Sequence, residues 1–283
     1  MNQGDKVGIV CCSNGQPQAN HEKIRKLEET LLQIGLIPVF SDYIYEKESA
    51  FSGTAIERAN ALMQFYKAED ISAIFDISGG DIANEILPYL DFEQIAGSDK
   101  QFWGYSDLTT IINAIYTKTG KASVLYQVRN LLYSDATNQI RNFSATLLHG
   151  TNELFDVHYE FVQGNFIQGI VVGGNIRCLL KLAGTPYWPD MQGKVLLLEA
   201  YSGLVPQMTT YLSQLQQMGV FEQISGIILG TFTELDKQDS AMSMLERIKQ
   251  FAGADIAIVK TNEIGHGVDS KAIIIGKSVI LRN

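Results

Sequence analysis

Short apolar runs alternate with amphipathic helical stretches through the first half of the chain. The apolar runs lie at Val7–Cys12, Ile37–Phe40, Ala73–Ile77 and Phe102–Tyr105. The helical patterns lie at Glu22–Ile34, Thr54–Lys67, Asp81–Leu87 and Leu108–Tyr116. This alternation is typical of buried parallel strands that are covered by helices. We therefore predict an α/β fold with an N-terminal doubly wound parallel sheet, and functional residues at the carboxyl ends of its strands.

The pattern changes near Gly150. Asp156–Val162 and Phe166–Val172 alternate between apolar and polar residues as β-strands do, and Gly164-Asn165 between them predicts a hairpin turn. We expect helices at Asn175–Leu182, Met208–Met218 and Met242–Phe251, and strands at Val195–Leu198, Gly226–Gly230, Ile256–Val259, Ala272–Ile275 and Ser278–Leu281. The chain is predicted to form an N-terminal domain at residues 1–145 and a smaller C-terminal α/β domain at residues 146–283.

Composition excludes several classes of protein. Of the 283 residues, 46% are hydrophobic and 19% are charged, as in an ordinary globular chain. The net charge of −9 argues against nucleic acid as a partner, because phosphate binding needs a basic surface. Three Cys cannot form a disulfide framework, and no apolar run approaches membrane-spanning length. Met1–Lys6 lacks the pattern of a signal peptide, so we do not expect export. We expect a cytoplasmic protein with no membrane partner.

One serine stands at the corner between a predicted strand and a predicted helix. In Gly104-Tyr105-Ser106-Asp107 the apolar run ends and the helical pattern begins. Such a corner exposes the serine hydroxyl, and the amide after it can stabilise an oxyanion from a helix N-terminus. The same residues also fit an ordinary N-cap after a turn, and Leu108 stands where the common elbow pattern has Gly. Ser106 is therefore a candidate nucleophile on pattern alone.

A nucleophilic serine needs a base, normally His, and an acid that orients the base. Among the four His, His266 stands out because Gly265 and Gly267 flank it in a predicted loop, which lets its side chain face a cleft. Taken alone, it also fits a loop residue that bonds locally. Glu199 ends a fully apolar strand, where a carboxylate must be paired or hydrogen-bonded. It can orient a histidine or cap the following turn.

Two glycine pairs follow predicted strands. Gly79-Gly80 lets the backbone approach a ligand and point amides into a cleft, so it can complete an oxyanion hole with the Asp107 amide. A phosphate loop is the competing interpretation for this pair and for Gly173-Gly174, although neither has a full dinucleotide fingerprint. Cys12 is a remote nucleophile candidate that fits a small buried residue better. No His or Cys spacing indicates a metal site.

These pieces, in this order, resemble the LD-carboxypeptidase family of serine peptidases, which includes the murein tetrapeptide carboxypeptidases and the microcin C immunity peptidases. The similarity spans nearly the whole chain. Its motifs are Lys6–Ser13, Arg58–Leu62, Gly79-Gly80, Leu87–Asp91, Gly104–Asp107, Gly173–Asn175, Gly184–Tyr187, Leu197–Glu199, Gly226–Gly230 and Gly265–Gly267.

The resemblance implies a role for each candidate. Ser106 would be the nucleophile, His266 the base and Glu199 the acid that orients it, with an oxyanion hole from the Gly80 and Asp107 amides. The N-terminal domain would carry the nucleophile and the C-terminal domain the acid and base. It also implies a cytoplasmic homodimer, a site between the domains, a small peptide or peptide-conjugate substrate, and no cofactor or metal.

Two departures from the family pattern concern the substrate. Murein-type members usually carry Arg before the double Gly, where this chain has Ser78, and many members have a His-Gly-Pro stretch where this chain reads Ser123–Gln127. The favoured substrate is a peptidoglycan-derived peptide with a terminal D-amino acid. Cleavage of a peptide–nucleotide conjugate and a non-catalytic ligand-binding protein are the alternatives. Because Ser78 carries no charge, we expect tolerance for uncharged leaving groups.

Overall fold

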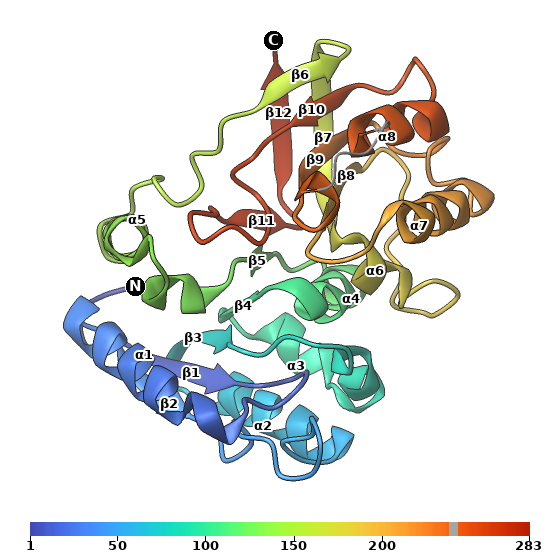
Figure 1. Cartoon of the computed structure of the whole chain (residues 1–283). Coiled ribbons are helices and arrows are strands. Elements are labelled where there is room, and N and C mark those ends of the chain that lie inside the picture. The colour runs from blue at the N-terminus through green and yellow to red at the C-terminus, as the bar shows by residue number, and fades with distance from the viewer. Residues whose placement is uncertain (238–242) are drawn as a thin grey trace.

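The computed structural model describes residues 1–237 and 243–283, and it forms two stacked six-stranded sheets (Figure 1). The first sheet has the order β11-β5-β4-β3-β1-β2, and all of its neighbours are parallel except β11 and β5. Its strands are β1 (Lys6–Val10), β2 (Ile37–Phe40), β3 (Ile71–Asp76), β4 (Gln101–Gly104), β5 (Ser123–Leu125) and β11 (Ile273–Ile275). This order is that of a doubly wound sheet, with a topological switch point between β1 and β3.

Helices cover both faces of the first sheet because its strands send apolar side chains to both sides. Ile74 packs on one face with α2 (Ala55–Lys67), α3 (Phe92–Gly97) and α4 (Thr109–Thr119). The next residue, Phe75, packs on the other face with α1 (His21–Ile34) and α5 (Ala136–His149). Short 3-10 helices lie at η1 (Gln18–Asn20), η2 (Ala83–Tyr89), η3 (Ser106–Leu108), η4 (Val128–Leu132) and η5 (Leu235–Lys237).

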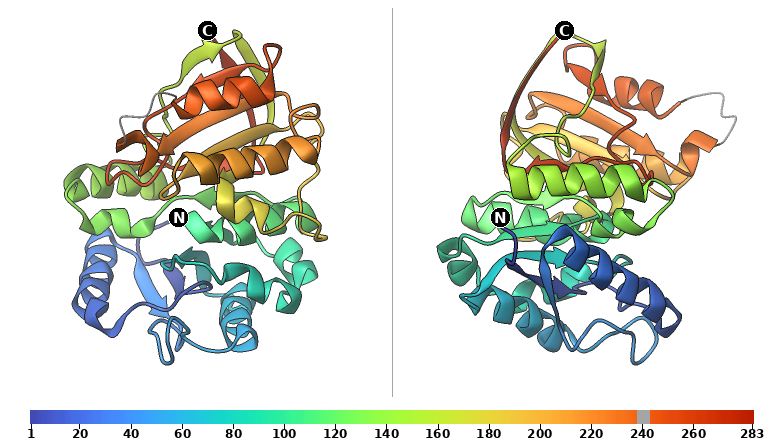
Figure 2. Two further views of the ribbon diagram at one scale, coloured as in Figure 1. Left: turned by 45° about the vertical axis from the view of Figure 1, so that its right-hand side comes forward. Right: turned by 90° about the vertical axis from the view of Figure 1, so that its left-hand side faces the viewer.

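The second sheet has the order β12-β7-β8-β9-β10-β6, with four parallel central strands and an antiparallel strand at each edge. Its strands are β6 (Glu160–Gln163), β7 (Phe166–Asn175), β8 (Val195–Ala200), β9 (Gly226–Phe232), β10 (Ile258–Lys260) and β12 (Ser278–Arg282). Its outer face packs against α6 (Ile176–Leu180), α7 (Val205–Gln217) and α8 (Met244–Ala252) (Figure 2).

One of three hydrophobic clusters is shared by the two halves. The inner face of the second sheet, through residues such as Leu197 and Ile228, belongs to the same cluster as α4 and the first sheet. In addition, β11 leaves the second half of the chain and pairs with β5, with Ile273 opposite Leu125. The residue predicted as the domain boundary, Ala145, lies inside α5, which packs on the first sheet.

Several sequence predictions are confirmed in type and differ at their ends. The predicted helix at Asp81–Leu87 is a 3-10 helix that begins only at Ala83. The predicted hairpin is wrong: Gly164 has the positive φ of 70° that a turn allows, but β6 pairs with β10, whereas β7 pairs with β12 and β8. Met242, at the start of one predicted helix, lies outside the described residues.

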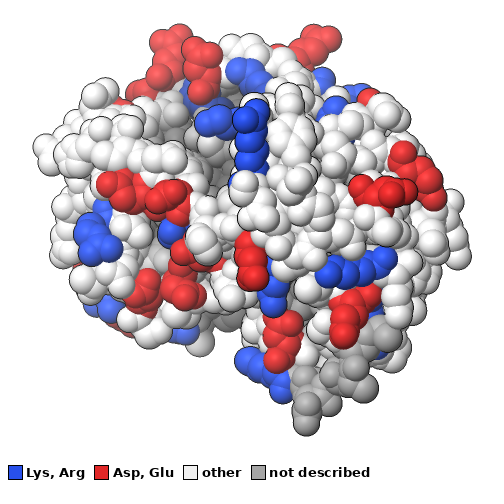
Figure 3. Space-filling model, turned by 90° about the horizontal axis from the view of Figure 1, so that it is seen from above, with Lys and Arg blue, Asp and Glu red and all other residues white. Residues whose placement is uncertain are grey.

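Acidic and basic side chains are interspersed over the face seen in Figure 3, with wide neutral areas between them. The excess of acidic residues does not gather there into one patch. Within residues 1–237 and 243–283, no helix has the length and apolar character needed to cross a lipid bilayer.

The shared core predicts that both halves unfold in one transition. Trp103 lies in the first sheet and Trp188 packs beside the second, so Trp103→Phe and Trp188→Phe each leave a fluorophore in one half. In each variant, urea unfolding followed by fluorescence should coincide with unfolding followed by circular dichroism. Ile275→Ala, added to either variant, should lower the free energy of unfolding equally, by roughly 2–5 kcal/mol. Two separated midpoints would contradict a shared core.

Candidate active site

Ser106 lies in a strained turn between β4 and α4. Its φ is +57°, and only Ser49 shares a positive φ among the described residues other than glycine. The preceding residue, Tyr105, is still extended, and η3 begins at Ser106 itself. A left-handed serine costs on the order of 1–3 kcal/mol, and such strain concentrates at functional sites. The chain therefore turns as sharply as the sequence pattern predicts.

The turn forms although Leu108 replaces the glycine of the common pattern. Leu108 is fully buried, and its Cβ lies 2.7 Å from the position that a Cβ on Gly104 would occupy. A larger residue at Gly104 would therefore clash with Leu108. The glycine before the serine, rather than one after it, provides the space for the close packing of this corner.

His266 and Glu199 meet beside this turn. The Nδ1 atom of His266 lies 2.8 Å from Oε2 of Glu199, whose side chain is 0% exposed, whereas the His266 side chain is 15% exposed. The hydroxyl of Tyr105 donates a hydrogen bond of 3.0 Å to the same carboxylate oxygen. Burial and the Glu199 charge raise the pKa of Tyr105 well above its usual value, so its hydroxyl remains a donor.

The distance between His266 and Glu199 is that of a hydrogen bond, whereas the angle does not meet the criterion for one. Nδ1 lies close to Oε2, yet it has no hydrogen-bond partner of acceptable angle among the described residues. The short distance is the better guide, because catalytic hydrogen bonds are often poorly aligned before substrate binds. Tyr105 packs edge-on to the imidazole, with ring centres 4.8 Å apart, and Tyr201 lies 5.1 Å away, so the ring is held on two sides.

The Gly79-Gly80 loop follows β3 and is held by the loop after β1. Gly80 has a φ of +120°, and a Cβ there would lie 2.1 Å from Asn14. The Asn14 amide donates to the Gly79 carbonyl at 3.1 Å, and its side-chain oxygen accepts from the Asp81 amide at 3.0 Å. Only glycine fits at residue 80, which brings this backbone to the same cavity as Ser106.

The side chain of Asp107 points away from the reaction site and anchors the serine turn. Its carboxylate is fully buried, and Oδ2 accepts from the Ser13 hydroxyl at 2.6 Å and from the Ala83 amide at 2.9 Å. Lys181, which follows α6 in the second half, contacts Oδ1 at 2.5 Å. The backbone amide of Asp107, rather than its carboxylate, is the group available for an oxyanion hole.

A second contact between the halves fixes the glycine loop. Arg177 of α6 forms an ion pair with Asp81, and it also donates to the Gly80 carbonyl at 3.3 Å. Lys181 donates to the Asp81 carbonyl at 2.8 Å. Partial burial raises the pKa of the Asp81 carboxyl, but Arg177 and Lys181 together outweigh this effect and hold the pKa below its usual value. These contacts connect the loop to the second sheet.

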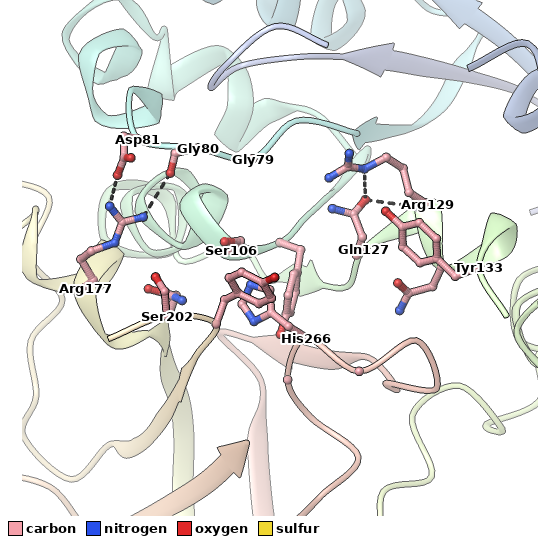
Figure 4. A pocket seen from close by; sticks show the side chains of 16 residues that line it. Gly79, Gly80, Asp81, Ser106, Gln127, Arg129, Tyr133, Arg177, Ser202 and His266 are labelled. Atoms are coloured by element: carbon pink, nitrogen blue, oxygen red, sulfur yellow. Dashed lines mark hydrogen bonds and ion pairs between the residues drawn. The ribbon is translucent and has the colours of Figure 1, made fainter. Parts of the chain in front are cut away.

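Loops at the carboxyl ends of strands in both sheets surround one cavity of about 480 Å³, a size suited to a small ligand. Ser106 and His266 lie centrally, Arg177 and Ser202 line one end, and Arg129 lines the other (Figure 4). Of the five residues predicted from the sequence, Ser106, Gly80 and His266 line the cavity, Glu199 contacts His266 from behind, and Asp107 adjoins Ser106.

Sequence reasoning did not find Tyr105, Arg129, Arg177 or Lys181. Arg177 and Lys181 follow a strand and a glycine pair, but no sequence signal shows that they reach the opposite sheet. Tyr105 stands beside the candidate serine, and its place in the motif was the only available indication. Partners so distant in sequence become visible only in the fold.

Other sequence candidates lie elsewhere. Cys12 is fully buried, and burial, with the nearby Asp76 charge, raises the pKa of its thiol well above the usual value, so it is not a poised thiolate. At Gly173, the amide and carbonyl both bond to the Asn113 side chain, which fills the space that a phosphate would need. Gly174 packs against Thr109. This glycine pair serves the contact between α4 and β7.

The sequence profile of the LD-carboxypeptidase N-terminal domain matches residues 7–126, and that of the LD-carboxypeptidase C-terminal domain matches residues 168–281. The chain belongs to the LD-carboxypeptidase family. The family expectation drawn from its motifs, and the two-part α/β fold, are thereby confirmed.

Several members of the LD-carboxypeptidase family align over most of the chain. A probable murein peptide carboxypeptidase of Bacillus subtilis is 28% identical, over 98% of this chain and 88% of that protein. The microcin C7 self-immunity protein MccF of Escherichia coli is 26% identical, over 80% of this chain and 75% of that protein.

Solved structures share the fold. MccF in complex with glutamyl sulfamoyl guanosine superposes with a TM-score of 0.87 at 21% identity, over 100% of this chain and 97% of that one. A muramoyltetrapeptide carboxypeptidase from Oxalobacter formigenes has a TM-score of 0.81 at 22% identity, over 98% and 95% of the two chains.

Lys181→Met should destabilise the protein. It removes the cation beside the buried Asp107 carboxylate, and breaking a buried pair in this way costs about 3 kcal/mol. The matched control is Lys6→Met, which breaks an ion pair of 2.7 Å with Asp70 on the surface, compared with 2.5 Å for Lys181 and Asp107. This control should cost less than about 1 kcal/mol. Urea unfolding measures both. Equal losses in the two variants would mean that the Asp107–Lys181 pair contributes no more than a surface contact.

Proposed function

We propose that this member of the family is a serine carboxypeptidase with a Ser106–His266–Glu199 triad. One observation carries the proposal: a serine in a strained turn lines the same cavity as a histidine whose Nδ1 lies 2.8 Å from a fully buried carboxylate. A buried Glu that contacts one imidazole nitrogen leaves Nε2 for the serine, as in a serine hydrolase triad. The membership of the chain in a carboxypeptidase family supports the same reaction.

The first half of the reaction acylates the serine. Ser106 Oγ attacks the carbonyl carbon of the scissile amide while His266 Nε2 accepts the hydroxyl proton. The Gly80 and Asp107 amides stabilise the oxyanion of the tetrahedral intermediate. His266 then gives its proton to the leaving amine as the carbon–nitrogen bond breaks, and the acyl group stays on Ser106.

Water completes the cycle. His266 takes a proton from a water molecule, which attacks the acyl-enzyme, and Ser106 recovers its proton as the acid product leaves. Glu199 stabilises the imidazolium that forms in each half. The Tyr105 hydroxyl keeps the carboxylate in place, because it donates to the oxygen that faces His266.

The favoured substrate is a peptidoglycan-derived peptide with a terminal D-amino acid. Relatives named for murein peptides support this choice. The same family includes MccF, whose solved complexes hold acyl sulfamoyl nucleosides, so a peptide–nucleotide conjugate is the second candidate. Hydrolysis of murein tetrapeptide beside an aminoacyl-nucleotide analogue separates the two.

Ser106→Ala should abolish hydrolysis and leave the fold intact. Loss of a triad nucleophile lowers kcat by several powers of ten, so we expect at least a thousandfold decrease in tetrapeptide hydrolysis. A fluorophosphonate probe should label the parent protein and not the variant. Circular dichroism checks the fold. Retention of a tenth of the activity would refute the role of Ser106, and absence of labelling in the parent would favour a binding protein.

Tyr105→Phe should lower kcat/KM by roughly ten- to a hundredfold, because a hydrogen bond to a charged group contributes roughly 1.5–3 kcal/mol. The raised pKa keeps Tyr105 protonated in the parent, so the ratio of parent to variant should stay constant from about pH 6 to pH 9. If Tyr105 lost its proton in this range, the ratio would fall as pH rises. Tyr43→Phe is the control, because Tyr43 donates to Glu57 far from the cavity.

A further inference from the structure

Arg129 lies at one end of the active-site cavity and is held in a fixed orientation. It belongs to η4, the 3-10 helix that follows β5 in the chain. The side-chain oxygen of Gln127 accepts from the Arg129 backbone amide at 3.1 Å and from its Nε at 3.2 Å. One of its terminal nitrogens, Nη1, donates to the side-chain oxygen of Gln16 at 3.4 Å. Figure 4 shows the guanidinium across the cavity from Arg177.

The charge of Arg129 is not compensated. Both of its side-chain partners are neutral amides, and no ion pair in residues 1–237 and 243–283 includes it, whereas Arg177 at the other end pairs with Asp81. Two of its five N–H donors are used, which leaves three. Its terminal nitrogen lies 3.9 Å from the place of a Cβ on Gly79, beside the loop that lines the cavity.

Ser78 cannot provide a competing charge. It is fully buried, its hydroxyl donates to Asp76 at 2.5 Å, and it accepts from the Ser13 amide at 3.0 Å. Its side chain therefore serves the packing beneath the Gly79-Gly80 loop. Among the described residues that line the cavity, Arg129 is therefore the Arg or Lys without an ion pair, and it is available to an anionic ligand.

We propose that Arg129 binds the terminal carboxylate of the peptide substrate and so sets the enzyme's specificity for a free C-terminus. This inference rests on the proposed function, and it replaces the expectation of tolerance that Ser78 suggested. Arginine presents a planar pair of donors that matches a carboxylate, and charge-assisted bonds of this kind are among the strongest.

The dimensions of the cavity agree with this role. A carboxypeptidase substrate carries its carboxylate one residue beyond the scissile amide, and consecutive Cα atoms lie about 3.8 Å apart. A volume of about 480 Å³ corresponds to a cube about 8 Å on a side or to a sphere about 10 Å across. The cavity is therefore large enough for one terminal residue, and Ser106 and Arg129 both line it.

The experiment compares murein tetrapeptide with its C-terminally amidated form. In the parent enzyme, amidation should lower kcat/KM by roughly a hundredfold. Arg129→Met should lower kcat/KM roughly thirty- to a hundredfold for the acid and less than about threefold for the amide. Arg129→Lys, which keeps the charge without the planar fork, should fall between. Arg141→Met on the exposed surface of α5 is the matched control and should change neither value.

Three results would overturn the proposal. Equal losses for the acid and the amide in Arg129→Met would mean that Arg129 only shapes the cavity. An unchanged kcat/KM for the acid would mean that the carboxylate is bound elsewhere. A loss confined to an aminoacyl-nucleotide analogue would mean that the group bound is a phosphoryl group.

Binding measurements separate this proposal from the proposed function. Calorimetry with Ser106→Ala reports affinity without turnover, and the acid should bind about a hundredfold more tightly than the amide only while Arg129 is present. If the parent hydrolyses neither peptide but this difference persists, the reaction assignment fails and the carboxylate site stands. If the parent hydrolyses both peptides equally well, the reaction stands and the carboxylate site fails.

Discussion

The buried carboxylate of Asp107 connects the segments that form the active site. It accepts from Ser13 and Ala83 in the first half of the chain and contacts Lys181 in the second. A carboxylate without water needs several such partners, since an uncompensated buried charge would be far too costly. The residue next to Ser106 therefore determines where the loops after β1 and β3 and the end of α6 can lie. Movement of one half against the other would break these contacts together.

The position of the cavity follows from the direction of the strands. Parallel strands in each sheet end at a common edge, and loops from both edges meet around Ser106 and His266. The nucleophile comes from one sheet, and Glu199 and His266 come from the other. Since the two sheets also share the cluster that contains Leu197 and Ile228, the separation between them is set by side-chain packing.

Local patterns in the sequence predicted most of the helices and strands, although not α3, β5 or α5. They also marked Ser106, Glu199 and His266 as candidates, whose triad roles came from the family resemblance. The strand-to-helix corner at Ser106, the apolar strand before Glu199 and the glycines around His266 are each readable over a few residues. The pairing of strands that lie far apart in the sequence could not be predicted from these local patterns. The turn at Gly164 predicted a hairpin, yet β6 pairs with β10, and β7 pairs with β12 and β8. Arg129 belongs to no recognisable motif. Its role depends on the absence of a carboxylate partner among the described residues, which only the fold shows.

The pairing of β11 with β5 has a consequence for synthesis on the ribosome. β11 begins at Ile273, whereas β5 ends at Leu125, so β11 is made long after β5. At roughly 5–20 residues per second, β5 waits on the order of 10–30 s after it is made. During this time its free edge can pair with other chains. A nascent chain of this fold thus has to extend past β11 before β5, in the sheet that carries the serine, has a partner on both sides.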